Sequence, residues 1–423
     1  MPPKLVLAVE KSYRWLRLKL LNAYFGNPAK NLRVIAITGT NGKTTTLNFI
    51  NQILKRASYK TAMFTTAVVE IDGVARVNDL NATIPTTAEL QRFFIDAKKS
   101  QADFVLLEAT SHALTQQKFP KFDLEAAIFT NLTQDHLDYH HSMEEYAFAK
   151  SKLWRMKPRF SILNIDDPRY EYFAQFNPRE KRVTYGVSHA ADIQIAKVTL
   201  YKKGSEIKLK LEDDIEPETI DVVTALAGKY NVYNVAAAVA LAKALNINNE
   251  DIINGIADLE SIPGRLERVE NKLGLDIIID YAHTPDALEK LLEYAQSVTD
   301  GQVNLVFGAT GDRDKAKRPI MGKIAAAKAD RIFITDEESY NEDPTSIRKM
   351  ILHGVNETEA GSIKTIEIAD RKNAIRAALE IADLGDAVLI TGMGHEHHRI
   401  VGGERILWND AEAVEEILSE ISP

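Results

Sequence analysis

A glycine-rich segment near the amino end constrains the fold more than any other stretch of this sequence. It reads Gly39-Thr-Asn-Gly-Lys-Thr-Thr45. The apolar run 34–37 before it predicts a buried parallel strand, and the apolar spacing over residues 47–54 after it predicts a helix. Strand, glycine loop and helix in this order form the setting that a phosphate-binding loop needs. The alternative is a plain glycine turn before a core helix, but the lysine and the hydroxyl groups that coincide here favour the phosphate loop.

The residue types of this loop suit a nucleoside triphosphate. Gly39 and Gly42 let the backbone turn tightly and point N–H groups inward, and the start of the helix adds its positive dipole end. We expect Lys43 to reach the β- and γ-phosphates and Thr44 to hold Mg²⁺. The spacing Gly-x-x-Gly-Lys-Thr is shorter than that of the common phosphate loop. The predicted nucleotide contacts in the loop are Gly39, Thr40, Asn41, Gly42, Lys43, Thr44 and Thr45.

Composition places the chain among globular proteins and narrows its chemistry. A chain of 423 residues predicts two or three domains of about 100–200 residues each. The absence of cysteine excludes disulfides, thiolate metal sites and a cysteine nucleophile, and it fits a cytoplasmic location. The net charge of −8 argues against broad binding to nucleic acid, although it allows a local basic pocket.

The amino end predicts a helix over residues 5–25. Lys11, Arg14, Arg17 and Lys19 interrupt its apolar residues, which argues against a membrane-spanning helix or a signal sequence. A basic helix lying on a membrane surface and a helix packed on the next domain both remain open, and packing is favoured. We expect residues 1–32 to form a short helical segment, since they are too few for a domain of ordinary size.

Strands and helices alternate over residues 33–263, which predicts a central α/β domain with a mostly parallel sheet. Alternating apolar residues over 183–223 predict an antiparallel flap. Strands are expected at 104–107, 126–129 and 160–163, and helices at 87–98, 144–155 and 231–245.

A second alternation begins after Ser261-Ile-Pro-Gly264, which marks the expected boundary between domains. It predicts a separate doubly wound, Rossmann-like domain over residues 264–423. Strands are expected at 277–280, 303–307, 331–335, 363–368 and 387–390, and helices at 286–296, 320–328, 345–352 and 372–382.

Polar residues follow two of the strands predicted in the central domain. Glu108 comes after the strand at 104–107, and Asp135 and His136 come after the strand at 126–129. Because the carboxyl ends of parallel strands meet at one edge of a sheet, we expect Glu108 and His136 to lie beside the glycine loop. A carboxylate and an imidazole there are candidate ligands of a second Mg²⁺. A lone histidine at a strand end is usually structural, but the crowding of acids and imidazoles favours the ligand interpretation.

Six motifs, in order along the chain, resemble those of the Mur ligases. Their closest resemblance within that family is to the MurE type, which extends the muramoyl peptide of peptidoglycan precursors. The match runs from about residue 33 to the end of the sequence. The motifs are Gly39-Thr-Asn-Gly-Lys-Thr-Thr45, Glu108-Ala-Thr-Ser-His112, Thr130-Asn-Leu-Thr-Gln-Asp-His136-Leu-Asp-Tyr-His140, Asp280-Tyr-Ala-His-Thr-Pro-Asp286, Gly311-Asp-Arg-Asp-Lys-Ala-Lys-Arg-Pro319 and Gly392-Met-Gly-His-Glu396.

This resemblance implies an ATP-dependent amide ligase. A substrate carboxylate attacks the γ-phosphate to form an acyl phosphate, and the amine of an amino acid then displaces phosphate. The chemistry of the phosphoryl step is mainly positioning and cationic stabilisation. The resemblance implies catalytic or metal-binding roles for Lys43, Thr44, Glu108, His136 and Lys150, with two Mg²⁺ sites and a carbamylated Lys150. The alternative for Lys150 is an ordinary surface lysine on an amphipathic helix.

The resemblance also implies the remaining contacts and the setting. The expected reaction belongs to cytoplasmic cell-wall synthesis and needs only small molecules as partners, with the chain as a monomer and closure of the last domain over ATP. On the nucleotide side the matching residues are Asn234, Arg265, Asp280 and His283. On the muramoyl side they are Thr83, Thr110, Ser111 and Lys118, and on the amino-acid side Arg313, Glu337, Glu338, Gly392 and Glu396.

Several departures from the family pattern concern the substrates. The uridine-binding front domain is nearly absent, so UDP is expected to contribute less to binding. A threonine motif reads Thr83-Ile-Pro85, and Met393 replaces a lysine. The block that clamps the distal carboxylate of diaminopimelate with an arginine reads Glu337-Glu-Ser-Tyr340. A phenol lacks the bidentate fork of a guanidinium, so an acidic pocket with Tyr340 predicts L-lysine or L-ornithine as substrate, unless the acids face solvent.

Two other functions remain as alternatives. A folylpolyglutamate- or polyglutamate-synthetase-like ligase also lacks the front domain, but its loop typically reads Gly-Lys-Gly-Ser rather than Gly-Lys-Thr-Thr. A regulatory nucleotide-binding module would be expected to lose the candidate magnesium ligands, which this sequence keeps. ATP turnover that depends on an amino acid would discriminate among the three.

Overall fold

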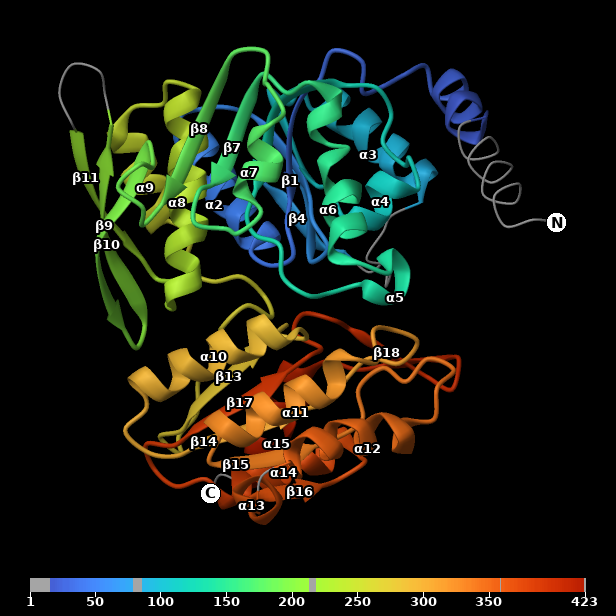
Figure 1. Cartoon of the computed structure of the whole chain (residues 1–423), viewed down its shortest axis with the longest axis vertical. Helices are drawn as coiled ribbons and strands as arrows, with labels where there is room; N and C mark the ends of the chain where they lie inside the picture. The colour runs from blue at the N-terminus through green and yellow to red at the C-terminus, as the bar shows by residue number, and fades with distance from the viewer. Residues whose placement is uncertain (1–15, 79–85, 213–217, 358, 422–423) are drawn as a thin grey trace.

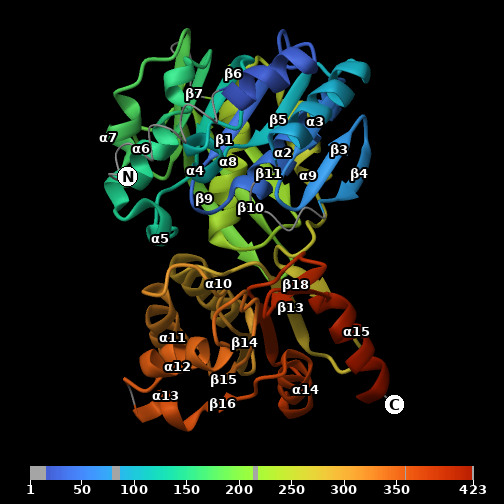
Figure 2. The ribbon, with the colours of Figure 1, turned by 90° about the vertical axis from the view of Figure 1, so that its right-hand side faces the viewer.

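The structure, a computed structural model, describes residues 16–78, 86–212, 218–357 and 359–421. The described chain forms two lobes, one above the other in Figure 1, and Figure 2 shows the same division from the side. Residues 16–24 are helical and carry the exposed side chains of Leu16, Leu20 and Tyr24, while the rest of the helix predicted over 5–25 lies outside the described residues. No helix in the described part of the chain is both long and apolar enough to span a membrane.

The first lobe is built on one sheet of eleven strands. The order across it is β11-β10-β9-β8-β7-β6-β1-β5-β2-β3-β4. Its centre is parallel and the strands toward both edges are antiparallel. The strands are β1 (Arg33–Thr38), β2 (Thr61–Phe64), β3 (Val68–Ile71), β4 (Val74–Val77), β5 (Phe104–Glu108), β6 (Asp123–Phe129), β7 (Phe160–Asn164), β8 (Lys181–Gly186), β9 (Ile193–Tyr201), β10 (Gly204–Leu211) and β11 (Glu218–Thr224).

Helices cover both faces of this sheet and divide its apolar side chains between two cores. One core packs α2 (Lys43–Arg56), α8 (Lys229–Ala244) and α9 (Asn249–Ala257) against residues such as Ile35 and Ile37 of β1. The other core packs against Val34 and Ala36 of the same strand. Because β1 is buried on both faces, its sequence is continuously apolar, as expected for a central parallel strand. The helices and turns of the second core are α3 (Thr87–Lys99), α4 (Ser111–Thr115), α6 (Met143–Ser151), η1 (Trp154–Met156) and α7 (Tyr170–Ala174).

Two sequence predictions for this lobe need correction. The predicted antiparallel strands within 183–223 are present as β9 to β11, but they extend the main sheet rather than form a flap, because β8 joins β7 and β9 in parallel. The helix expected at 144–155 ends at Ser151 and continues as the short turn η1. There the indole of Trp154 enters the core and its Nε1 donates to Ser161 Oγ over 2.7 Å. Burial of this large side chain overrides the helical spacing.

The second lobe is a six-stranded doubly wound sheet in the order β12-β13-β17-β14-β15-β16. Helices α10, α11 and α12 cover one face and α14 and α15 the other. The strand expected at 363–368 is shorter, because residues up to Ile363 are helical and only three pairs with β15 form. The elements are β12 (Glu267–Val269), β13 (Asp276–Asp280), α10 (Pro285–Val298), β14 (Val303–Phe307), α11 (Lys317–Lys328), β15 (Arg331–Ile334), α12 (Pro344–Val355), α13 (Glu359–Ile363), β16 (Thr365–Glu367), α14 (Arg371–Ile381), β17 (Ala387–Thr391), the hairpin β18 (His398–Val401) and β19 (Glu404–Leu407), and α15 (Asp410–Ile421).

Hydrogen bonds join the lobes at separate points. At the glycine loop, Asn41 Nδ2 donates to Asp286 Oδ2 at the start of α10 over 2.9 Å. At the tip of the β9–β10 hairpin, the carbonyl of Lys202 accepts from Arg268 Nη2 over 2.6 Å and from the hydroxyl of Tyr294 over 2.7 Å. The lobes are therefore in contact on both the nucleotide-loop side and the hairpin side.

Candidate active site

A cavity of about 740 Å³ lies where the carboxyl ends of the strands of both lobes meet. Its lining includes the glycine loop and Glu108 from the first lobe and Arg313, Glu338 and Glu396 from the second. This is the edge at which open α/β sheets place their ligands. This volume lies within the range that is typical of ligand-binding pockets.

The glycine loop follows β1 and opens helix α2, as the sequence predicts. Gly42 has φ +85°, and a Cβ there would lie 2.3 Å from Asn234 Oδ1. At Gly39 a Cβ would lie 1.8 Å from Thr130 Oγ1. Both positions therefore require glycine, the first for its backbone angle and both for lack of space. The loop is further fixed by Asn131 Oδ1, which accepts from the Asn41 N–H over 2.9 Å.

Two lysine side chains converge on this loop: Lys43 is partly buried and Lys150 is fully buried. Lys43 Nζ donates to the carbonyls of Thr40 over 2.6 Å and Gly39 over 3.2 Å. Lys150 Nζ, from α6, donates to the same Gly39 carbonyl over 2.6 Å. Burial lowers the pKa of Lys43, and burial together with the charge of Lys43 lowers the pKa of Lys150 well below its ordinary value. The cavity thus places two basic nitrogens where negative phosphate charge would develop.

The hydroxyl of Thr44 donates to Glu108 Oε1, and Glu108 Oε2 is buried without a hydrogen-bond partner. Oxygen donors of this kind fit Mg²⁺, and an orphaned carboxylate oxygen fits a missing cation. The described residues hold no cluster of three or more His, Cys, Asp or Glu side chains that could bind a metal by itself. Phosphate oxygens and water would therefore have to complete the coordination, which is usual for Mg²⁺.

His136 lines the cavity and its Nε2 lies 3.2 Å from Asp135 Oδ2. Burial lowers its pKa to about 3, so the ring is neutral and one nitrogen can bind a metal. β5 and β6, which deliver Glu108 and His136, are not paired with each other, because β1 lies between them. The predicted convergence of the two residues at the edge of the glycine loop nevertheless holds, since β1 carries the loop.

The nucleotide-side residues come from both lobes. Asn234 of α8 accepts from Thr46 Oγ1 over 3.2 Å, directly beneath the glycine loop. The guanidinium of Arg265 lies over the Tyr281 ring at 4.4 Å. The Asp280 carboxylate is occupied by the backbone N–H groups of Leu266 and Ala282, over 2.8 Å each, so it shapes the loop around the cavity. His283, whose Nδ1 lies 2.7 Å from the Tyr281 carbonyl, also lines the cavity.

Sequence reasoning missed two residues that join the lobes at the cavity. Lys317 is buried, and its Nζ lies 3.8 Å from Asp135 Oδ1 across the interface. Asp286 bonds to Asn41 of the glycine loop and forms an ion pair with Lys290 at 2.8 Å. Both residues lie inside motifs quoted above. Each is a charged residue at the start of a helix that follows a strand, and this position could have marked them as site residues.

The side of the cavity that is predicted to hold the amino acid is acidic. Glu337 Oε1 accepts from Thr310 Oγ1 over 2.6 Å, and its other oxygen, Oε2, is buried without a partner. Burial and the neighbouring carboxylates raise the pKa of Glu338 to about 7, and burial raises that of Glu396 to about 7. Gly392 leaves space for Glu337, because a Cβ there would lie 2.1 Å from Glu337 Oε2. Three carboxylates thus line one pocket, and its orphaned oxygen indicates a cation.

Arg313 and Tyr340 complete this pocket. The Arg313 guanidinium lies 5.0 Å from the centre of the Tyr340 ring, and the Tyr340 hydroxyl is 3.5 Å from Glu338 Oε2. The expected alternative, in which these acids simply face solvent, is wrong for Glu337, which is 4 % exposed.

The residues expected on the muramoyl side are only partly brought together. Thr110 and Ser111 line the cavity, where Thr110 caps α4 and the Ser111 hydroxyl lies 2.9 Å from His140 Nε2. Lys118 follows the same helix but does not line the cavity. Thr83 lies outside the described residues.

Comparisons with known proteins agree with this geometry. Residues 37–242 match the Mur ligase middle domain, and residues 264–394 match the Mur ligase glutamate ligase domain. The chain is 37% identical to a UDP-N-acetylmuramoyl-L-alanyl-D-glutamate–2,6-diaminopimelate ligase of Syntrophomonas wolfei, over 95% of this chain and 81% of the relative. It is 38% identical to the ligase of the same name from Geobacillus kaustophilus, over 96% and 82%.

Solved structures give the same result. A structure of a UDP-N-acetylmuramoyl-L-alanyl-D-glutamate–2,6-diaminopimelate ligase superposes with a TM-score of 0.64 at 31% identity, covering 97% of this chain and 83% of that one. A folylpolyglutamate synthase of Mycobacterium tuberculosis superposes with a TM-score of 0.70 at 17% identity, covering 89% and 92%. The second likeness shows a shared fold alone, so the polyglutamate-synthetase alternative is not favoured.

Proposed function

Since the chain belongs to the Mur ligase family, we propose that it joins a diamino acid to a UDP-N-acetylmuramoyl-dipeptide-like acceptor at the expense of ATP. Relatives 34–38% identical to this chain carry names that state a reaction of this class. The observation that carries the proposal is that one cavity is lined by Lys43, Lys150 and the glycine loop on one side and by three glutamates on the other.

The order of bond changes follows from the chemistry of a carboxylate. The acceptor carboxylate attacks the γ-phosphorus and ADP leaves, which gives an acyl phosphate. The amine of the amino acid then attacks the acyl carbon, loses a proton and expels phosphate. Lys43 is placed to stabilise the charge on the transferred phosphoryl group. Mg²⁺ held by Thr44 and Glu108, with His136 nearby, would neutralise phosphate charge when bound. Asn41–Asp286 and Lys317–Asp135 hold the two lobes together around the cavity.

We further propose that Lys150 carries a carbamate. Its neutral amine adds to CO₂ and releases one proton, and the product is an anionic oxygen ligand suited to Mg²⁺. Complete burial and the nearby charge of Lys43 favour the neutral amine that this step needs, which an ordinary surface lysine would lack.

The proposal also specifies the diamino acid, by the group that it carries at its distal end. The named relatives use 2,6-diaminopimelate, whose distal end carries a carboxylate as well as an ammonium. In this chain Tyr340 and three carboxylates occupy that side of the pocket, so a bare distal ammonium is favoured and Arg313 remains for the α-carboxylate. We propose L-lysine or L-ornithine as the preferred substrate.

The test is a phosphate-release screen of the twenty common amino acids, ornithine and diaminopimelate, with UDP-muramoyl-dipeptide present. Release that needs both the acceptor and a diamino acid supports the proposal. Release that no amino acid stimulates, or that only glutamate stimulates, would contradict it. We expect the reaction to take place in the cytoplasm, where ATP is made. We also expect the protein to act as a monomer, since the two lobes of one chain line the cavity. Light scattering during turnover would measure its oligomeric state.

A further inference from the structure

The amino-acid pocket is made by two loops that follow neighbouring strands. The loop over 308–316 follows β14 and carries Arg313, and the loop over 335–343 follows β15 and carries Glu338 and Tyr340. The Gly311 N–H donates to the Glu338 carbonyl over 2.6 Å. A Cβ at Gly311 would lie 1.9 Å from the Ser339 carbonyl oxygen, so the backbones touch. Loops of this kind have no ladder of hydrogen bonds, and their positions depend on specific side chains.

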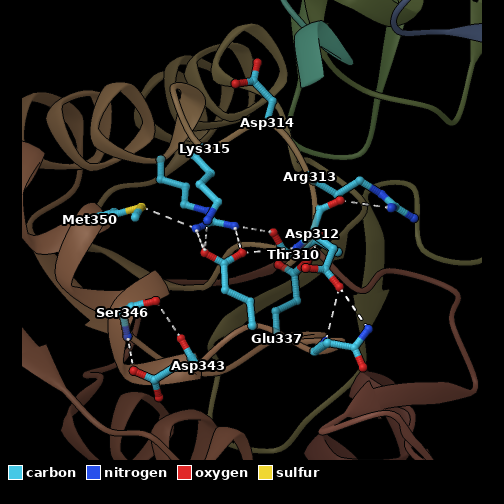
Figure 3. A network of polar contacts seen from close by, with 12 residues as sticks. Thr310, Asp312, Arg313, Asp314, Lys315, Glu337, Asp343, Ser346 and Met350 are labelled. Carbon is cyan, nitrogen blue, oxygen red and sulfur yellow. Dashed lines mark hydrogen bonds and ion pairs between the residues drawn. The ribbon is translucent and has the colours of Figure 1, made fainter. Parts of the chain in front are cut away.

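Glu342 is the side chain that ties the two loops together, and the network around it is drawn in Figure 3. Its two oxygens accept from Arg318 Nη1 and Nη2 over 2.8 Å each, and Lys315 Nζ lies 2.9 Å from Oε1. The Asp312 N–H donates to Glu342 Oε2 over 3.1 Å. Arg318 is completely buried and donates in addition to the Thr310 carbonyl over 3.1 Å. A bidentate pair of this kind fixes direction as well as distance.

The same network determines where the two substrate-facing side chains lie. Asp312 Oδ2 accepts from the Asn341 N–H over 3.2 Å, and the Asp312 carbonyl accepts from Arg313 Nη1 over 3.2 Å. Tyr340, at φ +51°, is held by the hairpin through hydrogen bonds to Ile400 and from Gly403 of 3.0 Å each. The Arg313 guanidinium then rests on the Tyr340 ring. Moving Asp312 relative to Asn341 would separate this pair.

We propose that Glu342, gripped by Arg318, is a positioning residue for the amino-acid substrate: it holds Arg313 against Tyr340 so that the guanidinium faces the α-carboxylate. The inference rests on the proposed function and deepens it. Glu342 touches neither ATP nor the acceptor, since it is absent from the cavity lining. Its effect is therefore confined to amino-acid binding and to the orientation of the attacking amine.

The test compares Glu342→Gln with the wild-type protein in steady-state kinetics with L-lysine. Removing the charge weakens every contact of the network, and we expect KM for lysine to rise about tenfold while KM for ATP changes less than about twofold. The matched control is Glu357→Gln, which removes an exposed 2.9 Å ion pair with Lys323 in the same lobe. A double-mutant cycle with Arg313→Ala measures whether Glu342 acts through Arg313.

Coupling is the decisive result. Glu342→Gln should cost little further kcat/KM for lysine once Arg313 is alanine. Full additivity, or equal losses for lysine, ATP and acceptor, would overturn the inference, since a merely structural residue would affect all three. If Glu342→Gln is too unstable for kinetics, Arg318→Lys replaces it, because it keeps the charge and loses the bidentate fork. The same comparison of KM for lysine with KM for ATP is then made on that variant. Wild-type protein without any amino-acid-dependent turnover would instead refute the proposed function.

Discussion

The nucleotide side and the amino-acid side of the cavity are built in opposite ways. The nucleotide side is one continuous segment: a strand buried in the middle of the eleven-stranded sheet, the four-residue loop 39–42, and a helix packed into a core. The amino-acid side is assembled from loops separated by many residues, together with the β18–β19 hairpin. The first carries the amines of Lys43 and Lys150, and the second carries the carboxyl groups of Glu337, Glu338 and Glu396.

This difference teaches which part of such an enzyme is free to vary. The phosphate loop is fixed by two glycines that contact other backbone and side-chain atoms, so few substitutions fit there. The acidic pocket depends on side chains carried by loops, where a change such as arginine to tyrosine alters the charge without disturbing a core. We therefore expect substitutions to be tolerated less in the phosphate loop than in the acidic pocket.

The largest expected effect concerns Lys43, on the nucleotide side of the cavity. We expect Lys43→Ala to reduce kcat for ADP release about 10²- to 10³-fold, because a positioned charge at the transferring phosphate is lost. Folding should be little changed, since its contacts are to loop carbonyls. Lys98→Ala, on the exposed face of α3, is the matched control. Near-normal turnover of the Lys43 variant would show that the loop has been misassigned.

The second prediction tests whether Lys150, on the nucleotide side, carries the proposed anionic carbamate. If the lysine is carbamylated, Lys150→Ala should lose about tenfold or more in kcat, and formate or acetate should restore part of it by supplying the missing carboxylate oxygens. A carbamate carbon should also appear by NMR after incubation with ¹³C-bicarbonate. An unmodified lysine in nucleotide-bound protein, or a variant of full activity, would contradict this proposal.

The third prediction concerns Tyr340 and the choice of amino acid in the acidic pocket. The wild-type protein should prefer L-lysine or L-ornithine over meso-diaminopimelate, and Tyr340→Arg should move the ratio of kcat/KM values toward diaminopimelate by about tenfold or more, since a guanidinium adds a bidentate contact to the distal carboxylate. Tyr340→Phe is the control, because it keeps the ring under Arg313. A wild-type preference for diaminopimelate would refute the specificity argument.

The smallest effect concerns pH. Glu338 and Glu396 have raised pKa values of about 7, so both are largely neutral at pH 6 and ionised at pH 8. The distal ammonium of lysine stays charged over this range. KM for lysine should therefore fall as pH rises from 6 to 8, by about tenfold if one group dominates. Glu338→Gln should flatten this profile, and an increase of KM with pH would be opposite to the expected sign.

The same contrast explains what the sequence could predict. The phosphate loop, the parallel strands and the residues Lys43, Glu108 and His136 follow from local patterns, because each lies at a fixed offset from a buried strand. The shape of the acidic pocket does not. Its orphaned Glu337 oxygen and the grip of Arg318 on Glu342 depend on tertiary hydrogen bonds between distant segments, which no periodicity encodes.

The errors have a similar origin. The alternating pattern of the strands beyond β8 predicts their antiparallel pairing, but their place in the main sheet is a tertiary property that the pattern does not encode. The hairpin β18–β19 and helix α15 were not predicted. The hairpin is only partly buried and packs its backbone on Tyr340, so its amphipathic signal is weak.

The tip of the β9–β10 hairpin has a consequence for how this chain can change over evolutionary time. The atom that receives Arg268 and Tyr294 from the other lobe is the carbonyl oxygen of Lys202, and every amino acid supplies that oxygen. A substitution of Lys202 therefore keeps these two hydrogen bonds, although it removes the 3.7 Å ion pair of Lys202 Nζ with Asp276 Oδ2. One residue inserted or deleted along the hairpin shifts the carbonyl by about 3.3 Å, farther than a hydrogen bond can follow. We therefore expect these contacts between the lobes to tolerate a change of residue in the hairpin better than a change of its length.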